Sequence, residues 1–325
     1  MYQIHPLRGR SRKGCILYER NKKMSLIKKK TEIELPVSIV GCIYGTPGIG
    51  KSTVALSAPR PLLLDTDKGI HRVQAEYRCD CVQVKDYQNI LDVLEEDLSD
   101  YDTIVIDTLG ELVNYMLKYF AEKDKALITR GGTYNIKIWG LIKTEFQNLK
   151  MKLQHLNKHL IFVAHQAEDK DGETKVYRMD VAGSTSKDII KILDFLGYCE
   201  MLGKTRSISF SPSARFYAKN SIQLIDYLEI PTLNAGDTND FITREIINPT
   251  INRRKEESQE IKKVEEVLEQ GRYLIDQAEE PNAVLTALKT MDLTTHTKIT
   301  LFNELSAKFS NYTFDKKKGE FVVNG

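Results

Sequence analysis

The sequence of this protein predicts an α/β fold, in which a mostly parallel β-sheet is flanked by helices. Two observations lead to this prediction. From residue 31 onward, short apolar runs typical of buried strands alternate with longer segments whose apolar residues recur every three or four positions. Beyond Pro249 the composition becomes charge-rich and helical. We therefore expect a core over residues 31–250 and a small, mainly helical region over residues 251–325 that ends in a hairpin.

The composition is that of a soluble globular protein. Of the 325 residues, 41% are hydrophobic and 28% are charged, and no apolar run approaches the length of a membrane span. The basic N-terminus lacks the apolar segment of a secretory signal. The five cysteines form no C-x-x-C pair and are best explained as reduced thiols. We expect a cytoplasmic protein with no membrane partner.

The net charge of +2 conceals a strongly basic N-terminus. Residues 1–30 contain ten Lys or Arg against one Glu, a local charge of +9, which leaves −7 for the rest of the chain. We expect residues 1–30 to be a disordered leader, with Met24 as a possible true start of translation. The rival interpretation is a basic arm that contacts nucleic acid. The charge of the remaining chain does not indicate nucleic-acid binding.

One stretch near the start of the core matches the phosphate-loop pattern G-x-x-x-x-G-K-[ST] without a mismatch. Its glycines allow backbone N–H groups to surround phosphate oxygens, while the lysine reaches the β- and γ-phosphates and the serine hydroxyl holds Mg²⁺. An apolar strand at 37–44 precedes the loop, and a helix at 51–56 follows it. The predicted nucleotide-binding residues are Gly45, Thr46, Pro47, Gly48, Ile49, Gly50, Lys51, Ser52 and Thr53.

The alternation of strand and helix continues along the chain. Further strands are predicted at 61–65, 80–84, 103–107, 159–164, 196–201, 207–210 and 215–218. Helices are predicted at 87–98, 109–121, 134–155, 184–195, 252–280, 282–288 and 298–309, and a hairpin at 312–323. The polar stretches 124–133 and 167–175 are predicted to be loops, the second of them mobile.

Polar residues stand where several of these strands end, at the edge of the sheet where α/β folds bind ligands. Asp107 follows the apolar run 104–106 and is a candidate to orient Mg²⁺ together with Ser52. Asp65 and Asp67 end another strand, and either one could position the attacking water or simply stabilise a turn. His165 and Gln166 end a third strand, and of these two we favour Gln166 as a sensor of the γ-phosphate.

Four segments in order, GTPGIGKST, LLLDTDKGI, YDTIVIDT and HLIFVAHQ, resemble the RecA-like P-loop NTPase core. They are most similar to phage-encoded RecA-like ATPases of the small single-strand-annealing type. The resemblance covers residues 31–250 and implies ATP and Mg²⁺ as cofactors.

Carried over residue by residue, the resemblance implies a catalytic set. Lys51 binds phosphate, Asp107 is the Walker-B acid, and Gln166 couples the nucleotide state to a DNA-binding loop. Asp67 stands where the family has a catalytic Glu, one methylene longer. Lys219 would project into the ATP site of a neighbouring subunit and act in trans, although the basic residue that follows it in the family is Ser221 here.

The same resemblance implies two partners. Single-stranded DNA would contact residues 122–133 and 167–187, and the protein would form a homo-oligomer with ATP at the subunit interface. Both segments also contain acidic residues, which weakens the electrostatic case for DNA binding.

The leading function is therefore an ATPase that binds single-stranded DNA and promotes annealing or recombination in phage-type DNA metabolism. Two alternatives remain open: a small-molecule phosphotransferase, and a nucleotide-gated interaction module with negligible turnover. Asp67 in place of Glu and Ser221 in place of a basic residue motivate the second.

Overall fold

The computed structural model describes residues 27–183 and 185–324. Glu34–Lys263 form one compact unit, and the described residues outside this range form the other. Most of the expected leader, including Met24, lies outside the described residues. The boundary between the two units, after Lys263, falls within the long helix α6 (Asn248–Gln277). The boundary expected near residue 250 lies in the first turn of that helix.

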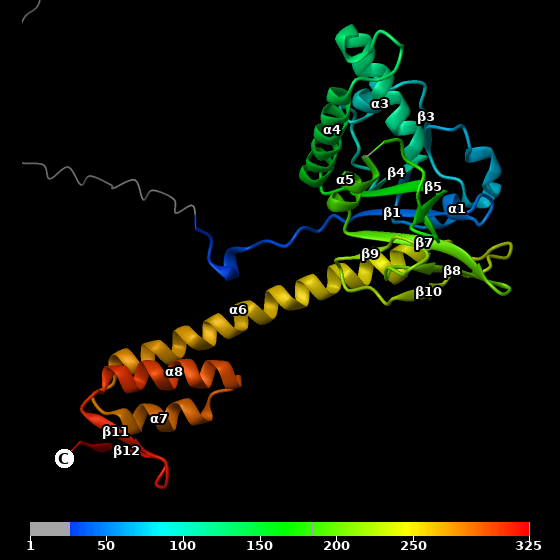
Figure 1. The fold of residues 1–325 in the computed structure, drawn as a ribbon. Coiled ribbons are helices and arrows are strands. Elements are labelled where there is room, and N and C mark those ends of the chain that lie inside the picture. The colour runs from blue at the N-terminus through cyan, green and yellow to red at the C-terminus, as the bar shows by residue number, and fades with distance from the viewer. Residues whose placement is uncertain (1–26, 184, 325) are drawn as a thin grey trace, which may run out of the picture. The chain divides into compact units, whose positions relative to one another are not determined.

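The larger unit is built on one mixed sheet (Figure 1). Six strands run parallel in the order β7-β1-β5-β4-β2-β3, so β5 lies between the strand that precedes the phosphate loop and the strand that ends in Asp107. Their bounds are β1 Val40–Gly45, β2 Pro61–Asp65, β3 Cys81–Gln83, β4 Thr103–Asp107, β5 His159–Asp171 and β7 Phe195–Leu202. The predicted mostly parallel α/β core is confirmed.

Antiparallel strands extend this sheet beyond β7. β8 (Thr205–Ser209) pairs with β7 and with β10 (Tyr227–Glu229), and β9 (Lys219–Asn220) pairs with the start of β7. The strand expected at 215–218 is thus displaced to β9, and β10 was not predicted.

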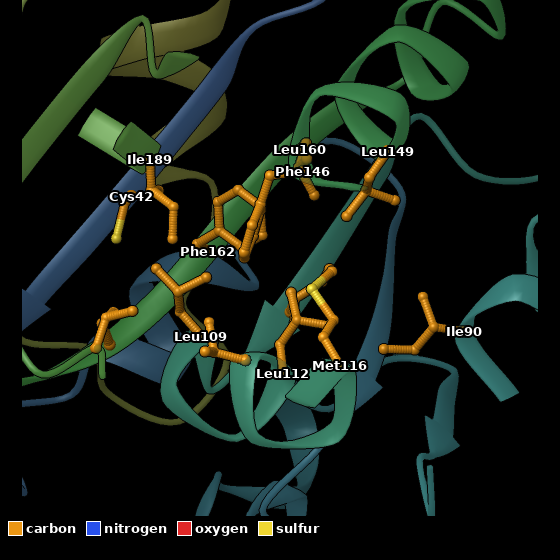
Figure 2. Packing of buried hydrophobic residues seen from close by; sticks show 14 of the residues in the cluster. Cys42, Ile90, Leu109, Leu112, Met116, Phe146, Leu149, Leu160, Phe162 and Ile189 are labelled. Carbon is orange, nitrogen blue, oxygen red and sulfur yellow. The ribbon is translucent and has the colours of Figure 1, made fainter. Parts of the chain in front are cut away.

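The sheet is buried on both faces because successive side chains of each strand point in opposite directions. Val40, Cys42 and Tyr44 of β1 pack on one face, whereas Ile39 and Ile43 pack on the other. The first face is covered by α2 (Tyr87–Val93), α3 (Leu109–Lys123), α4 (Ile136–His155) and α5 (Thr185–Ile192), as Figure 2 shows in part. The second is covered by α1 (Lys51–Ala55) and the π-helical turn Thr243–Ile247.

The stretch after Gln166 differs from its prediction as a mobile loop. β5 continues to Asp171 and pairs antiparallel with β6 (Thr174–Met179), with Gly172 at the turn. Two ion pairs join the strands: Lys175 with Glu168 at 2.7 Å and Arg178 with Asp169 at 3.0 Å. The acidic and basic residues that looked like loop composition are cross-strand partners on an exposed hairpin.

The smaller unit has a separate core. α6 (Asn248–Gln277) leads into α7 (Pro281–Thr290), α8 (Thr295–Lys308) and the hairpin of β11 (Tyr312–Asp315) and β12 (Glu320–Val323). Leu268, Leu301, Leu305 and Phe321 are buried at its centre. Gly271 permits the close approach of α8, because a Cβ there would lie 2.4 Å from a methyl group of Leu301. No helix in the described part of the chain is long and apolar enough to cross a membrane.

Candidate functional site

A cavity of about 410 Å³ lies at the carboxyl ends of the parallel strands, beside the phosphate loop. One wall is the loop and the start of α1, and the other walls come from the ends of β4 and β5 and from the segment after β2. The lining residues are Pro47, Gly48, Gly50, Lys51, Ser52, Thr53, Asp67, Gly69, Arg72, Val73, Asp107, Val163 and His165.

The phosphate loop needs glycine at three positions for identifiable reasons. Gly48 and Gly50 have φ values of +81° and +94°, which disfavour any residue with a Cβ. A Cβ on Gly45 would lie 2.1 Å from the backbone oxygen of Cys199 on the neighbouring strand. Backbone conformation therefore requires glycine at positions 48 and 50, and the close pairing of β1 with β7 requires it at position 45.

The ammonium group of Lys51 is buried within the loop. Nζ donates to the backbone oxygens of Gly45 at 3.0 Å and Thr46 at 2.8 Å, and the residue is only 6% exposed. Burial lowers the pKa of this group, and nearby Cys199 and Asp107 oppose the change. A charged donor held by two neutral carbonyls can exchange them for phosphate oxygens, which are stronger acceptors.

Ser52 and Asp107 are brought together from elements 55 residues apart in the chain. The Ser52 hydroxyl donates to Oδ2 of Asp107 at 2.5 Å. Burial raises the pKa of Asp107 to about 6, although the Ser52 hydrogen bond opposes the rise. A hydroxyl and a carboxylate are the oxygen ligands that Mg²⁺ prefers, and phosphate and water complete its shell. These two residues fit the metal that the motif implies.

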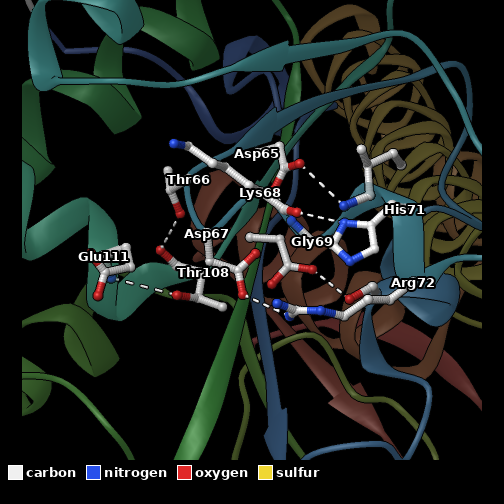
Figure 3. Close-up of polar contacts among 12 residues, drawn as sticks. Asp65, Thr66, Asp67, Lys68, Gly69, His71, Arg72, Thr108 and Glu111 are labelled. Carbon is white, nitrogen blue, oxygen red and sulfur yellow. Dashed lines mark hydrogen bonds and ion pairs between the residues drawn. The ribbon is translucent and has the colours of Figure 1, made fainter.

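The two acids at the end of β2, Asp65 within the strand and Asp67 after it, have different surroundings (Figure 3). Asp65 is buried and accepts hydrogen bonds from the backbone N–H groups of Gly69 at 2.7 Å and Ile70 at 3.1 Å, so it stabilises the turn. Asp67 lines the cavity and forms an ion pair with Arg72 at 3.2 Å. Of the two, only Asp67 is placed to act on a nucleotide.

His165 and Gln166 are consecutive on β5 and so face opposite sides of the strand. His165 lines the cavity, and its buried Nδ1 has no hydrogen-bond partner among the described residues. Burial, followed by the charge of Lys51, lowers the pKa of His165. Gln166 is absent from the cavity lining and accepts a hydrogen bond from the Tyr198 hydroxyl at 3.1 Å. The structure thus places the histidine, rather than the favoured glutamine, beside the phosphate loop.

Lys219 also lies away from the cavity of its own chain. Nζ donates to the backbone oxygens of Ile190, Lys191 and Leu193, at 3.0, 3.1 and 2.6 Å. These carbonyl groups belong to the last turn of α5 and to the residue after it, where a cation is favoured. In this conformation the lysine caps a helix.

Two arginines near the phosphate loop were not predicted from the sequence. Arg72 lines the cavity together with residues of the loop. Arg206 of β8 lies against the loop, since a Cβ on Gly50 would be 2.6 Å from one of its guanidinium nitrogens. Arg72 could have been predicted from its spacing. It lies five residues after Asp67, and the short turn after β2 brings the two residues together at the edge of the sheet. Arg206 carries no comparable local signal.

Comparisons with known proteins give one matching family and two similar proteins. The chain is similar to the SPbeta prophage-derived uncharacterized protein YorG of Bacillus subtilis (strain 168), with 27% identity over 139 residues, which is 42% of each chain. It is also similar to the crystal structure of the RadB recombinase, with 17% identity and a TM-score of 0.34 over 54% of this chain and 80% of that one. Residues 38–222, more than half of the chain, match the family described as the AAA domain, and they contain the phosphate loop, Asp67, Asp107 and His165: this protein belongs to the AAA domain family of P-loop ATPases.

Proposed function

We propose that this protein hydrolyses ATP in an Mg²⁺-dependent reaction in the cavity beside the phosphate loop. The observation that carries the proposal is the contact between the Ser52 hydroxyl and the Asp107 carboxylate, next to the buried ammonium of Lys51. Together they supply two metal ligands and a phosphate-binding cation at one point.

The chain's own residues have distinct roles in this proposal. Lys51 exchanges its bonds to loop carbonyls for bonds to phosphate oxygens. Ser52 and Asp107 would hold Mg²⁺, which when bound would neutralise phosphate charge. Asp67 orients the attacking water and accepts its proton, and the unpartnered Nδ1 of His165 offers a further polar contact to the phosphate.

Binding and turnover measured together test this proposal. We expect Lys51→Ala and Asp107→Ala to abolish Mg²⁺-dependent ATP binding and phosphate release. A matched control is Asp92→Ala, because Asp92 lies on α2 away from the cavity lining. Normal ATP binding by Lys51→Ala would disprove the assignment of the site.

We further propose that the ATPase acts on single-stranded DNA as a homo-oligomer, in annealing or recombination within phage-type DNA metabolism. Support comes from the resemblance of the four sequence segments and from the prophage origin of the relative named above. The proposed DNA contacts are residues 122–133 and 167–187. Two cations of the second segment, Lys175 and Arg178, are paired with acids on the hairpin. Electrostatic attraction would therefore come mainly from other exposed cations, namely Lys170 and Lys187 with Lys125 and Arg130.

ATPase rates with and without added DNA test this second proposal. We expect single-stranded DNA to stimulate turnover more than double-stranded DNA, and Lys125→Gln with Arg130→Gln to reduce the stimulation. A trans role for Lys219 requires its three bonds at the end of α5 to open. Equal turnover with and without DNA, together with no binding at low salt, would rule out the DNA partner.

One observation favours an alternative function with negligible ATP turnover, a nucleotide-gated interaction module. The Asp67 carboxylate is engaged by Arg72 and is therefore not free to activate water in this conformation. Tight ATP binding without phosphate release would support that alternative.

A further inference from the structure

We propose that Arg72 contacts the γ-phosphate and makes the site selective for nucleoside triphosphate over diphosphate, and that its ion pair with Asp67 restrains Asp67 until the triphosphate binds. The inference rests on the proposed nucleotide site and adds to it a residue that selects the ligand. Arg72 lines the same cavity as Lys51 and Ser52, and Figure 3 shows its ion pair with Asp67.

The backbone around Arg72 is held to the edge of the sheet. Asp65 accepts hydrogen bonds from Gly69 and Ile70, and the Arg72 amide donates to the Gly69 oxygen at 2.9 Å. Val73, the next residue, is 4% exposed and packs in the core. The point from which the arginine side chain leaves is therefore fixed relative to the phosphate loop.

The guanidinium group, in contrast, is not enclosed. The Arg72 side chain is 64% exposed, and among the described residues its guanidinium group pairs with Asp67 alone, at 3.2 Å. The Asp67 side chain is 21% exposed. An exposed ion pair of this kind contributes little to stability. A phosphate group carries more charge and accepts two guanidinium N–H groups at once, so it can replace the carboxylate.

The charges of Arg72, Asp67 and Lys51 act within the same cavity. The charges of Lys51 and Arg72 both lower the pKa of His165, after the larger effect of burial, while Asp67 opposes them. The charge of Asp67 in turn raises the pKa of Asp107. Arg72 and Asp67 therefore act on the same residues as the phosphate loop does, which is expected if they face the terminal phosphate.

Transfer of Arg72 to the γ-phosphate has a chemical consequence. It leaves the Asp67 carboxylate free to accept a proton from water as the water oxygen bonds to the γ-phosphorus. The bond from that phosphorus to the β–γ bridging oxygen breaks, ADP retains the bridging oxygen with its electron pair, and inorganic phosphate is released. With ADP alone, no γ-phosphate competes for Arg72 and the ion pair persists.

Equilibrium binding of Mg²⁺–ADP and of the non-hydrolysable β,γ-imido analogue of ATP tests the proposal without turnover. In Arg72→Ala we expect affinity for the triphosphate analogue to fall about tenfold or more, with ADP affinity changed by less than about twofold. Arg72→Lys keeps the charge without the planar donor pair, so its affinity for the triphosphate analogue should lie between those of the wild type and Arg72→Ala. Lys68→Gln, which changes an exposed cation of the same segment outside the cavity lining, should alter neither affinity.

Asp67→Asn tests the restraint separately. Removing the carboxylate charge should release Arg72 and raise affinity for the triphosphate analogue, while phosphate release from ATP falls. The proposal is overturned if Arg72→Ala weakens both nucleotides equally, or if Asp67→Asn weakens the triphosphate analogue. A wild-type protein that binds neither nucleotide would instead disprove the proposed function itself.

Discussion

Asp107 is held in surroundings that favour its neutral form, which is common where function conflicts with stability. Burial raises its pKa to about 6 from the ordinary value of 3.8. The folded state therefore binds a proton more readily than the unfolded state, and stability is lost as the pH rises from about 4 to about 6. At neutral pH the ionised carboxylate is a cost that a bound cation would offset.

Asp107→Asn should consequently stabilise the protein in the absence of metal. We expect a gain on the order of 2 kcal/mol in unfolding free energy at pH 7.5, together with loss of Mg²⁺-dependent nucleotide binding. Urea unfolding in EDTA measures the gain, and Asp92→Asn, at an exposed position on α2, serves as the control. A less stable Asp107→Asn protein would show that the carboxylate contributes more through hydrogen bonding than it costs through burial.

His159 has the opposite dependence on pH. Its Nδ1 accepts a hydrogen bond from the Ile39 N–H at 3.1 Å, which requires the neutral ring, and burial lowers its pKa to about 4. Because the unfolded histidine binds a proton near pH 6.5, stability is complete above that pH and is lost as the pH falls toward 4.

Comparison of His159→Gln with the wild type isolates this effect, because glutamine can still accept the bond from Ile39. Between pH 7.5 and pH 5 the wild type should lose about 2 kcal/mol more unfolding free energy than the variant. His155→Gln, at an exposed position on α4, should follow the wild type. An identical pH profile for His159→Gln would mean that this histidine does not drive the acid sensitivity.

At the scale of elements, the hairpin of β5 and β6 is connected to the sheet through Tyr198. Its ring stacks with that of Tyr177 of β6, with centroids 5.9 Å apart, and with that of Phe216, at 4.5 Å. Its hydroxyl donates to Gln166, where β5 passes from the parallel sheet into the hairpin. Tyr198 therefore joins the strand edge beside the phosphate loop to the segment proposed to contact DNA.

Two substitutions separate the ring from the hydroxyl. Tyr198→Ala should cost about 3–4 kcal/mol and speed amide exchange across β6, because it empties a stacked aromatic site. Tyr198→Phe should cost about 1 kcal/mol and leave β6 protected. Urea unfolding with hydrogen-exchange mass spectrometry measures both, with half-exposed Tyr227→Ala of β10 as the control. Equal costs for the two Tyr198 variants would assign the effect to the hydroxyl.

At the scale of the whole molecule, the two units have separate hydrophobic cores. The cores of the larger unit reach along the chain only to Ile251, and the core of the smaller unit begins at Val264. The single tryptophan, Trp139 on α4, belongs to the larger unit. Tryptophan fluorescence therefore reports only the unit that contains the phosphate loop.

We expect two unfolding transitions and a nucleotide effect on only one of them. Mg²⁺–ATP at about 100 times its dissociation constant should stabilise the fluorescent transition by about 2.7 kcal/mol. Phe321→Ala, in the core of the smaller unit, should lower the unfolding free energy of that unit only. That transition is detected by circular dichroism and not by tryptophan fluorescence. Stabilisation of that second transition by nucleotide would contradict this separation.

The sequence by itself determined the features that depend on local pattern: the parallel α/β core, the phosphate loop, and the strands that carry Asp107 and His165 to one edge. Hydrophobic periodicity decides which face is buried, and the loop's glycines act through their own backbone. Only the tertiary structure decided which polar groups meet. It showed that Asp65 stabilises a turn, that Asp67 pairs with Arg72, and that His165 rather than Gln166 lines the cavity. It also showed that the Lys219 side chain binds carbonyl groups at the end of α5, and that charges of the predicted loop form pairs on a hairpin. Such contacts depend on strand register and on side-chain direction between segments distant in the chain, which local sequence does not record.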